Sequence, residues 1–521
     1  CNFINNSASQ YGSHINSCGY NAISNCLFKG GNRHAIFQDC GSVSNYTNCL
    51  IDASNSSYAI SGNGKPNLLN CTILNYTEIA YHAHGNGSAD ILNTIFIPLD
   101  GHEEALIAYN DRNDAAINVT IDYSFFLNEG VDVALQGGGQ ITYGSNNVNG
   151  IESPLFCNDG NENFSLASNS PCVGSGQNGE NIGAFDIGCG DVFKNYHVSA
   201  DAQNGGNGGV DTPFLTIQSA IDAVSNSDTI LVASGIYSEN INFNGKNIVI
   251  QGEDKNNTII DGAQGGTVIV IDNTGQSSIL RNFTIMNGTG SEFEGLGGNV
   301  AGGIYVTQNN TILDNLIIKN NSSVAIGGGV FISADEVVLK NSIIRNNSTE
   351  GDGGGVALLN TNGINMYNNV IYDNIASEGG ALSVQGSNSA DINFCTIYGN
   401  SNYGIFIGFN SQMVLSNSIL WDNSDHQVYY RQNNGTADLS IQFSNIEGGQ
   451  NDIFVNGYGT LDWGEGNINS NPLFVDYFNQ NFMLSEFSPA LGGASITDIV
   501  ASDINGNSRP NPVGTNPDMG A

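Results

Sequence analysis

Two groups of polar and aromatic residues in this sequence carry side chains that could bind a ligand. The first group comprises Tyr81, His82, His84, His102, Glu103, Tyr109, Asp111 and Arg112, and the second comprises Tyr403, Trp421, His426, Tyr429, Tyr430 and Arg431. Aromatic faces stack on sugar rings, and Asp or Arg side chains hydrogen-bond to hydroxyl groups. The two groups could therefore form a glycan-binding platform. The interpretation we favour is that these amphipathic side chains cover the last turns of the fold.

Metal ligation is a second chemistry that some of these residues could support. His82, His84 and His102 supply three imidazoles, but the sequence defines no fourth ligand. Acidic residues at Glu292, Glu294, Glu350 and Asp352 could hold calcium, or could be solvated turns. We expect no cofactor, with calcium as the alternative. The identity of any metal is left open.

The ten cysteines are concentrated in the first part of the chain, with only Cys395 after residue 190. There is no C-x-x-C pair, which argues against zinc ribbons and thioredoxin-like chemistry. Cys26, Cys49 and Cys71 recur at intervals of 23 and 22 residues. A ladder of small inward residues is expected, continued later by Ser342, Cys395 and Ser418. A metal site and oxidation are the alternatives.

Disulfides are expected because export permits them. The pairs proposed are Cys157–Cys172 and one pair among Cys1, Cys18, Cys26, Cys40, Cys49 and Cys71.

A repeated structural unit must position the candidate binding residues and the cysteines. The second Gly of a Gly-Gly pair recurs at Gly303, Gly329, Gly355 and Gly380, at intervals of 26, 26 and 25 residues. Each unit holds three short β-branched runs bounded by Gly, Asn or Ser, which is typical of strands. One such unit cannot bury a core alone, so stacked copies are required. The sequence therefore predicts an all-β, right-handed parallel β-helix with three strands in each rung.

Asparagine and glycine are expected to form the corners of this helix. Asn341, Asn368 and Asn393 follow the second strand of their units, where a tight turn needs a left-handed backbone. Their amides can bond to the neighbouring rung, and the paired glycines relieve steric crowding at another corner. We interpret Asn341, Asn368 and the four glycines as a structural ladder.

Residues 196–262 interrupt the repeat. Ile217, Ala220, Ile221 and Val224 have the spacing of one apolar helix face, which predicts a short helix near 216–226. A helix there could cap the open strands of a β-helix. Similar endings, "NPLF…SPAL" and "SPLF…SPCV", occur twice. We therefore expect two tandem β-helices: residues 1–190 as the later part of a first one that continues upstream, 191–212 as a linker, and 213–521 as a complete second one.

The charge balance restricts the partners. The chain has 49 acidic and 13 basic residues, a formal net charge of −36. Such a surface repels phosphate, so we expect no nucleic-acid partner. No run of eighteen apolar residues is present, and we expect no membrane insertion.

The sequence resembles the right-handed parallel β-helix repeat proteins of the pectin-lyase-like superfamily, in particular the secreted bacterial or archaeal surface type. The resemblance is carried by "TPFLTIQSAIDAVSNSDTILVASGIYSENI", by the "GGGV…NSII" rungs, and by the closing "NPLF…DINGNSRP…PDMGA". It implies the fold. Lyases of this superfamily use Asp-bound calcium with an Arg or Lys base, and its hydrolases show Asp-Asp and Gly-His-Gly motifs. Neither of these hydrolase motifs occurs here, and no Arg lies beside an obvious Asp cluster. No catalytic residue is therefore nominated.

The function expected from the sequence is that of a non-enzymatic protein of the cell exterior: a rigid rod, adhesin or filament component. Its partners would be further copies or neighbouring surface-protein domains. The alternative is a carbohydrate-binding or polysaccharide-degrading β-helix, acting as a lyase or a glycoside hydrolase.

Overall fold

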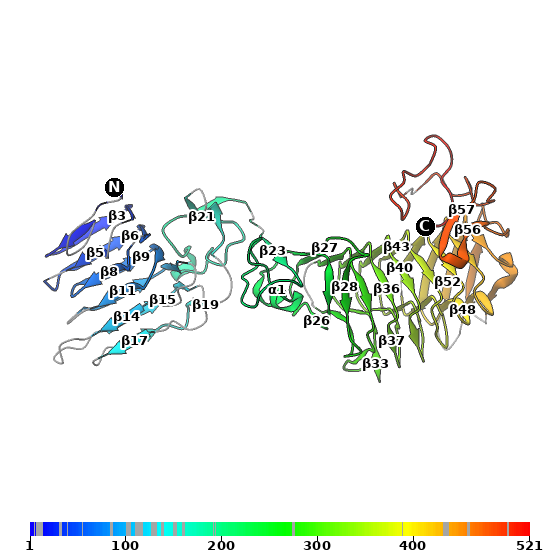
Figure 1. Ribbon diagram of the computed structural model, residues 1–521, viewed down its shortest axis with the longest axis horizontal. Coiled ribbons are helices and arrows are strands. Elements are labelled where there is room, and N and C mark those ends of the chain that lie inside the picture. The colour runs from blue at the N-terminus through cyan, green and yellow to red at the C-terminus, as the bar shows by residue number, and fades with distance from the viewer. Residues whose placement is uncertain are drawn as a thin grey trace. The chain divides into compact units, whose positions relative to one another are not determined.

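The computed structural model describes most of residues 1–521. It leaves aside residues 5, 7–13, 31–33, 39, 55, 84–86, 100–105, 110–117, 127–132, 137–139, 150–153, 159–161, 191, 193, 273–276, 388, 431–436, 456–458 and 498–499. The fold is an all-β parallel β-helix, in which each strand pairs in parallel with the strand three positions away along most of the chain. This arrangement confirms the predicted β-helix architecture. The chain divides into two compact units, Cys1–Phe193 and Lys194–Ala521 (Figure 1).

Unit 1 contains three parallel sheets, here named 1A, 1B and 1C in the order in which the chain visits them. Sheet 1A is formed by β1 (Asn2–Ile4), β4 (Leu27–Lys29), β7 (Leu50–Asp52), β10 (Thr72–Tyr76), β13 (Ile95–Pro98), β16 (Phe125–Phe126) and β19 (Val148–Asn149). Sheet 1B is formed by β2 (Ile15–Ser17), β5 (His34–Gln38), β8 (Tyr58–Gly62), β11 (Ile79–Ala83), β14 (Leu106–Tyr109) and β17 (Val133–Gln136). Sheet 1C is formed by β3 (Asn21–Ser24), β6 (Val43–Thr47), β9 (Lys65–Leu69), β12 (Ala89–Leu92), β15 (Asn118–Asp122) and β18 (Gln140–Tyr143).

Unit 2 repeats the order with sheets 2A, 2B and 2C. Sheet 2A is formed by β25 (Gly235–Tyr237), β28 (Thr258–Asp261), β31 (Thr284–Met286), β36 (Ile317–Lys319), β40 (Ile343–Arg345), β44 (Val370–Tyr372), β47 (Thr396–Tyr398), β50 (Ile419–Trp421) and β53 (Asn445–Ile446). Sheet 2B is formed by β26 (Ile241–Asn242), β29 (Ile269–Ile271), β34 (Ile304–Val306), β38 (Val330–Ile332), β42 (Val356–Leu359), β45 (Leu382–Gln385), β48 (Tyr403–Ile407), β51 (His426–Tyr430) and β54 (Ile453–Val455). Sheet 2C is formed by β23 (Asn195–Val198), β24 (Thr229–Val232), β27 (Val249–Gly252), β30 (Ile279–Arg281), β35 (Ile312–Asp314), β39 (Val338–Lys340), β43 (Ile364–Tyr367), β46 (Ala390–Asn393), β49 (Ser411–Ser416), β52 (Ala437–Gln442) and β55 (Thr460–Trp463).

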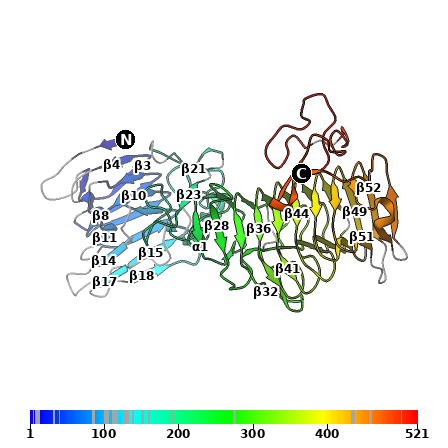
Figure 2. The same cartoon turned by 45° about the vertical axis from the view of Figure 1, so that its right-hand side comes forward.

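Small elements outside the six sheets complete the fold. They are α1 (Ile217–Ala223), β32 (Ser291–Glu292), β33 (Asn299–Val300), β37 (Ser322–Ser323), β41 (Ser348–Thr349) and the 3-10 turns η2 (Gln177–Gly179), η3 (Gly449–Asp452) and η4 (Tyr477–Asn479). Strand β32 pairs antiparallel with β33, and β37 pairs in parallel with β41. The labels of β32 and β41 mark the edge of unit 2 where these strands lie (Figure 2). Among the described residues, no helix has the length and apolar character needed to cross a membrane.

The interior of each unit is built from like side chains stacked rung over rung. In sheet 2A one inward column consists of Ile260, Ile285, Ile318, Ile344, Ile371, Ile397, Leu420 and Ile446, and every member is fully buried. β-branched side chains suit this pleated, two-sided packing. Backbone pairing at the usual strand spacing of about 4.8 Å therefore also aligns the core.

Helix α1 lies where the apolar spacing predicted it. Thr216 caps its start by accepting a hydrogen bond from the Ser219 amide, and Ile217, Ala220 and Ile221 are fully buried. The helix contacts β23, β24 and β26 of the first rung. Strand β23 lies inside the segment predicted as a linker and pairs with β24, so that part of the segment belongs to sheet 2C.

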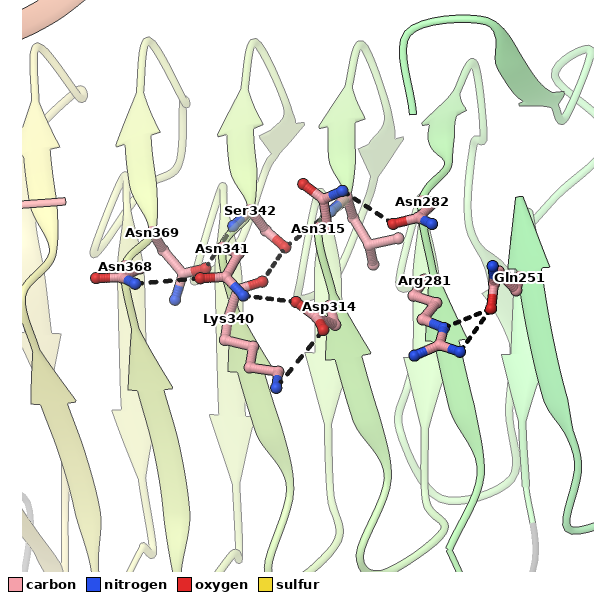
Figure 3. A network of polar contacts seen from close by, with 11 residues as sticks. Gln251, Arg281, Asn282, Asp314, Asn315, Lys340, Asn341, Ser342, Asn368 and Asn369 are labelled. Carbon is pink, nitrogen blue, oxygen red and sulfur yellow. Dashed lines mark hydrogen bonds and ion pairs between the residues drawn. The ribbon is translucent and has the colours of Figure 1, made fainter. Parts of the chain in front are cut away.

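Two ladders of asparagine hold unit 2 at its corners. The first lies between sheets 2C and 2A, where Asn315, Asn341, Asn368 and Asn417 all have positive φ. Asn368 Nδ2 donates to Asn341 Oδ1 at 3.1 Å, and Asn341 Nδ2 donates to Asp314 Oδ1 at 2.7 Å. Figure 3 shows this corner together with the Arg281–Gln251 and Lys340–Asp314 contacts. Polar side-chain contacts therefore connect successive rungs along this corner.

The second ladder is buried and was not predicted. Asn321, Asn347, Asn374 and Asn400 lie at the turn after sheet 2A and are at most 1% exposed. Each side-chain NH₂ donates to the carbonyl of the next asparagine at 3.0–3.1 Å, and Asn400 continues the chain to Asn423 at 2.9 Å. Each carbonyl also accepts a backbone N–H, so these buried amides are satisfied in the way that burial requires.

Two predicted ladder positions are wrong by one residue. Asn393 pairs with Tyr367 in sheet 2C, and Phe394 has the positive φ that Asn368 has one rung earlier. In the same way Ala381, not Gly380, shares the register of Gly355, because Val356 pairs with Leu382. In both cases the equivalent residues lie 26 apart, whereas the Gly-Gly pair and the asparagine recur after 25, so the sequence motif falls one residue before the structural position. Gly303, Gly329 and Gly355 do lie in one column, where an added Cβ would lie 2.4–2.6 Å from a backbone oxygen.

The cysteines differ from the proposed pairing. The disulfides are Cys18–Cys40 and Cys157–Cys189, so the predicted Cys157–Cys172 pair is wrong, and Cys172 is a buried free thiol. Cys18–Cys40 is one of the pairs that the sequence left open. Cys26, Cys49 and Cys71 are buried in the core of unit 1, as expected for small inward residues.

Each unit ends in an antiparallel hairpin that folds back onto its first sheet. We call these clasp 1 (residues 154–190) and clasp 2 (residues 472–521). Clasp 1 contains β20 (Phe156–Asn158), β21 (Asn163–Ala167) and β22 (Ile187–Cys189), whereas clasp 2 contains β56 (Phe474–Asp476) and β57 (Asn481–Leu484).

The two clasps dock through the same backbone contacts. The Gly183 amide donates to the Asn93 carbonyl at 2.9 Å, and the Gly520 amide donates to the Asn417 carbonyl at 2.8 Å. The next residues, Ala184 and Ala521, donate to Thr72 and Thr396 hydroxyls. Thr72 lies on β10 of sheet 1A and Thr396 on β47 of sheet 2A, so sheets 1A and 2A are equivalent.

Candidate functional site

A stack of aromatic rings lies along the outer face of sheet 2B. Phe406, Tyr429 and Phe454 are in register on β48, β51 and β54. The Tyr429 ring is parallel to that of Phe454 at 5.2 Å and to that of Tyr403 at 4.2 Å between centroids. Tyr403 and Tyr429 are half-buried, and Phe454 is 42% exposed. Since the rings cover one another's faces, the stack presents mainly ring edges to the outside of the last rungs.

A histidine and an aspartate adjoin this aromatic stack. The His426 ring is stacked on Phe454 at 5.4 Å, and its Nδ1 lies 3.3 Å from Asp452 Oδ1. The other oxygen of Asp452 accepts the Gln427 amide at 2.9 Å, so the carboxylate is fixed to the backbone of β51. Apolar ring faces bordered by an oriented polar pair are the usual composition of a sugar-binding surface.

The structure separates the residues predicted for this region. His426 and Tyr429 belong to the stack, together with Tyr403, whereas Tyr430 points into the core and is 1% exposed. Burial raises the pKa of Tyr430 well above its usual range. Trp421 lies on β50 of sheet 2A and packs against the core under clasp 2. Arg431 lies outside the described residues.

Unit 1 carries a related ring stack on sheet 1B, the equivalent of 2B. The Tyr58 ring lies between His34 at 5.1 Å and His82 at 4.9 Å, and both pairs are near-parallel. His34 is 6% exposed, and Tyr58 and His82 are half-buried. This stack is therefore more deeply covered than the one in unit 2.

Of the remaining predicted residues of the first group, only Tyr81 has a described side chain, and it does not join this stack. Tyr81 is a core residue, 1% exposed, and its pKa is raised by burial. His84, His102, Glu103, Asp111 and Arg112 lie outside the described residues, and the side chain of Tyr109 is likewise not described. The metal site suggested for His82, His84 and His102 stays a prediction.

Acidic residues recur on successive rungs beside sheet 2B. Ile326, Asp352 and Glu378 form a column of parallel bridges, and Asp352 Oδ2 accepts a hydrogen bond from Gln385 Nε2 at 2.9 Å. Glu292, Glu294 and Glu350 are exposed. In the described part of the chain, no three His, Cys, Asp or Glu side chains are grouped to hold a metal. The calcium hypothesis stays a prediction.

A cleft of about 750 Å³ lies between sheet 2A and clasp 2. Its walls include Lys255, Tyr372, Phe482 and Arg509. Arg509 donates to Asn368 Oδ1 at 2.7 Å and to the Gly520 carbonyl at 2.9 Å, and its guanidinium covers the Phe394 ring at 4.1 Å. Burial lowers the pKa of Arg509 to about 10. Since its donors are used within the protein, Arg509 holds the clasp in place.

Comparison with known proteins identifies only distant relatives. No protein-family model matches the chain. A probable pectinesterase/pectinesterase inhibitor of Arabidopsis thaliana is 38% identical over 90 residues, and the match spans 16% of this chain and 18% of that protein's length.

Similarity to solved structures is also low. Pectate lyase Pel9A shares 14% identity, with 63% of this chain and 96% of that chain covered and a TM-score of 0.37. The structure of XylC with xylose shares 11% identity, with 52% and 67% covered and a TM-score of 0.36. Carrot pectin methylesterase shares 15% identity, with 53% and 90% covered and a TM-score of 0.27.

Proposed function

We propose that the protein is an extracellular β-helix that binds a carbohydrate on the outer face of sheet 2B. The observation that supports this most directly is the stack of half-buried Tyr403 and Tyr429 with exposed Phe454, beside the His426–Asp452 pair. Because these rings stack on one another from rung to rung, their outward edges would form an apolar strip along which an extended polysaccharide would lie. Asp452 and His426 would then bond to hydroxyl groups at the border.

The charge of the chain favours a neutral glycan. With a net charge of −36, the surface repels a polyanion over about a Debye length, roughly 8 Å at physiological ionic strength. A neutral, hydroxyl-rich polysaccharide carries no such penalty. This proposal takes up the carbohydrate-binding part of the alternative that the sequence suggested.

Affinity electrophoresis tests this proposal. The full chain is run through gels that contain a neutral or an acidic polysaccharide, alongside a Tyr429→Ala/Phe454→Ala variant. We expect retardation by a neutral glycan and at least tenfold weaker binding of the double variant. Phe478→Ala is the matched control, because Phe478 is 82% exposed on clasp 2 and away from sheet 2B.

Two results would contradict the proposal. One is equal retardation of the wild type and the double variant. The other is depolymerisation of any glycan by the wild-type chain, seen as new reducing ends or unsaturated products, which would make the protein an enzyme.

We further propose that each unit is a rigid element of a tandem rod at the cell exterior, with α1 covering the first rung of unit 2. The continuous core from Val198 to Ile453 and the buried asparagine ladder support rigidity. Electron microscopy of the cell surface and of the purified chain tests this role. Images in which one unit bends or separates into smaller particles would contradict it.

A further inference from the structure

Two cations lie beside each other on the outer face of sheet 2A. Lys319 of β36 is in register with Arg345 of β40, so the two residues are one rung apart, at the usual strand spacing of about 4.8 Å. Both residues are half-buried. In the described strands, this is the one place where two basic residues are aligned in register.

Three other basic residues of the described strands are aligned with an aspartate. Lys29 is aligned with Asp52 in sheet 1A, the equivalent of sheet 2A. In sheet 2C, Arg281 and Lys340 are aligned with Asp314 from either side, and Lys340 forms an ion pair with it at 3.5 Å (Figure 3). An aspartate carboxylate therefore offsets the positive charge in these columns.

No described carboxylate does the same for the Lys319–Arg345 pair. Neither residue forms an ion pair within the described part of the chain, and Arg345 donates only to Asn346 Oδ1, at 2.9 Å. The charge of Arg345 acts on Asp373, directly after the next strand, but Asp373 is exposed and lies beyond ion-pair distance. Partial burial and the charge of Arg345 lower the pKa of Lys319, as expected for a cation beside an uncompensated cation.

Apolar side chains border this pair of cations. Met286 precedes Lys319 in the same column, and Ile317 and Ile343 lie two residues before Lys319 and Arg345 on the same face. All three apolar residues are half-buried, so part of each is accessible. Apolar surroundings lower the local dielectric constant and strengthen the attraction between the cations and an anion.

We propose that Lys319 and Arg345 bind the carboxylate of a small organic monocarboxylate whose apolar part covers Ile317 and Ile343. A carboxylate is the group that accompanies the cations of the other columns. It offers one oxygen to an ammonium group and the other to a guanidinium N–H. A ligand with a single charge is favoured because the repulsion by a chain of net charge −36 grows with the charge of the ligand. This site is separate from the aromatic stack on sheet 2B.

Cyclohexanecarboxylate is the probe, and acetate and cyclohexanol represent its two halves. Saturation-transfer NMR on the full chain measures binding, with the ionic strength held constant by sodium chloride. We expect saturable binding of cyclohexanecarboxylate and about tenfold weaker binding of acetate, because acetate covers less apolar surface. Cyclohexanol should not bind.

Matched variants separate this pair from the general effect of charge. Lys319→Gln/Arg345→Gln should bind cyclohexanecarboxylate at least tenfold more weakly, because both charged hydrogen bonds are lost. Arg281→Gln/Lys340→Gln also removes two cations, from sheet 2C, and should bind as the wild type does. Ile317→Ser should weaken the binding of cyclohexanecarboxylate and leave that of acetate unchanged.

Three outcomes would overturn the proposal. The first is no saturable binding of the probe to the wild type. The second is an equal loss of binding in the two double variants, which would mean that net charge alone attracts the probe. The third is a dimer of the wild type that Lys319→Gln/Arg345→Gln dissociates, without probe binding, which would mean that the pair contacts a carboxylate of a second copy.

Discussion

The two clasps dock in the same way but are fastened differently. Both place a Gly-Ala pair against the first sheet of their unit with matching backbone hydrogen bonds. Clasp 1 is then closed by the Cys157–Cys189 disulfide, whereas clasp 2 is closed by Arg509 through Asn368 and Gly520. The docking geometry is therefore set by the backbone, and the fastening varies with the side chains available.

A second difference lies inside the units. Unit 2 has the buried ladder from Asn321 to Asn423 at the turn after sheet 2A. In unit 1 the position three residues after the inward Ile51 and Ile73 holds Ser54 and Tyr76. These rungs of unit 1 therefore lack the asparagine that forms the side-chain ladder of unit 2.

The largest expected effect comes from breaking this ladder. Asn374→Ala removes a side chain that bonds to Asn347 and Asn400 and leaves buried amide groups unpaired, at a cost of about 4 kcal/mol in the free energy of unfolding. Chemical denaturation should show the loss in unit 2 and none in unit 1. Asn365→Ala, in the same rung but exposed, is the control and should cost under about 0.5 kcal/mol. An equally small effect at Asn374 would mean that the ladder does not stabilise unit 2.

Removing the disulfide should make clasp 1 resemble clasp 2. A Cys157→Ser/Cys189→Ser variant opens a loop between residues 32 apart in sequence, which costs about 3 kcal/mol. The amide hydrogen-exchange rate of β21 should then rise towards that of β57. The exchange rates of unit 2 should not change. Val475→Ser is the control. Unchanged protection of β21 would show that β22 stays paired without the disulfide.

Removing Arg509 should loosen only clasp 2. Arg509→Ala leaves the buried Asn368 side chain and the Gly520 carbonyl without a donor, and we expect a loss of about 2 kcal/mol. The measurement is hydrogen exchange of residues 500–521 together with thermal unfolding. Arg345→Ala, at a guanidinium that bonds only locally to Asn346, is the control. If Arg509→Ala and Arg345→Ala change the hydrogen exchange of residues 500–521 equally, Arg509 does not hold clasp 2 in place.

The smallest expected loss of stability comes from the docking glycines, and it tests most directly whether the two clasps are equivalent. Gly183 and Gly520 have φ of 108° and 89°, which L-residues rarely adopt, and an added Cβ would lie 2.6 Å from Ile95 and 2.8 Å from Thr396. Gly183→Ala and Gly520→Ala should each cost about 1 kcal/mol, and the two losses should be similar. Differential scanning calorimetry can compare them. Gly190→Ala, in open space, should be neutral.

The architecture could be predicted because it is repeated in the sequence. The recurring Gly-Gly pairs and short β-branched runs identified the rungs, and the spacing of Ile217, Ala220 and Ile221 identified α1. The register failed at Ala381 and Phe394, because the Gly-Gly and Asn motifs recur there after 25 residues whereas the strands repeat after 26.

The sites were less predictable for a different reason. The signal for the buried ladder was present, as an Asn after each "IIKN" or "IIRN" run, but an asparagine gives no sign of its burial in the sequence. Tyr429 and Tyr430 are adjacent, yet one faces outward and the other lies in the core, because alternate residues of a strand face opposite ways. Cys157 had two possible partners nearby, and only the pairing of β22 with β21 brings Cys189 next to it.

Each buried asparagine from Asn321 to Asn400 donates one side-chain N–H to the asparagine of the rung that follows and also donates to a backbone carbonyl of the preceding rung. Duplicating or deleting one whole coil would therefore leave every donor facing an acceptor, whereas inserting a single residue would not. The protein can thus change length in evolution by complete turns, and a designer could lengthen it in the same increments.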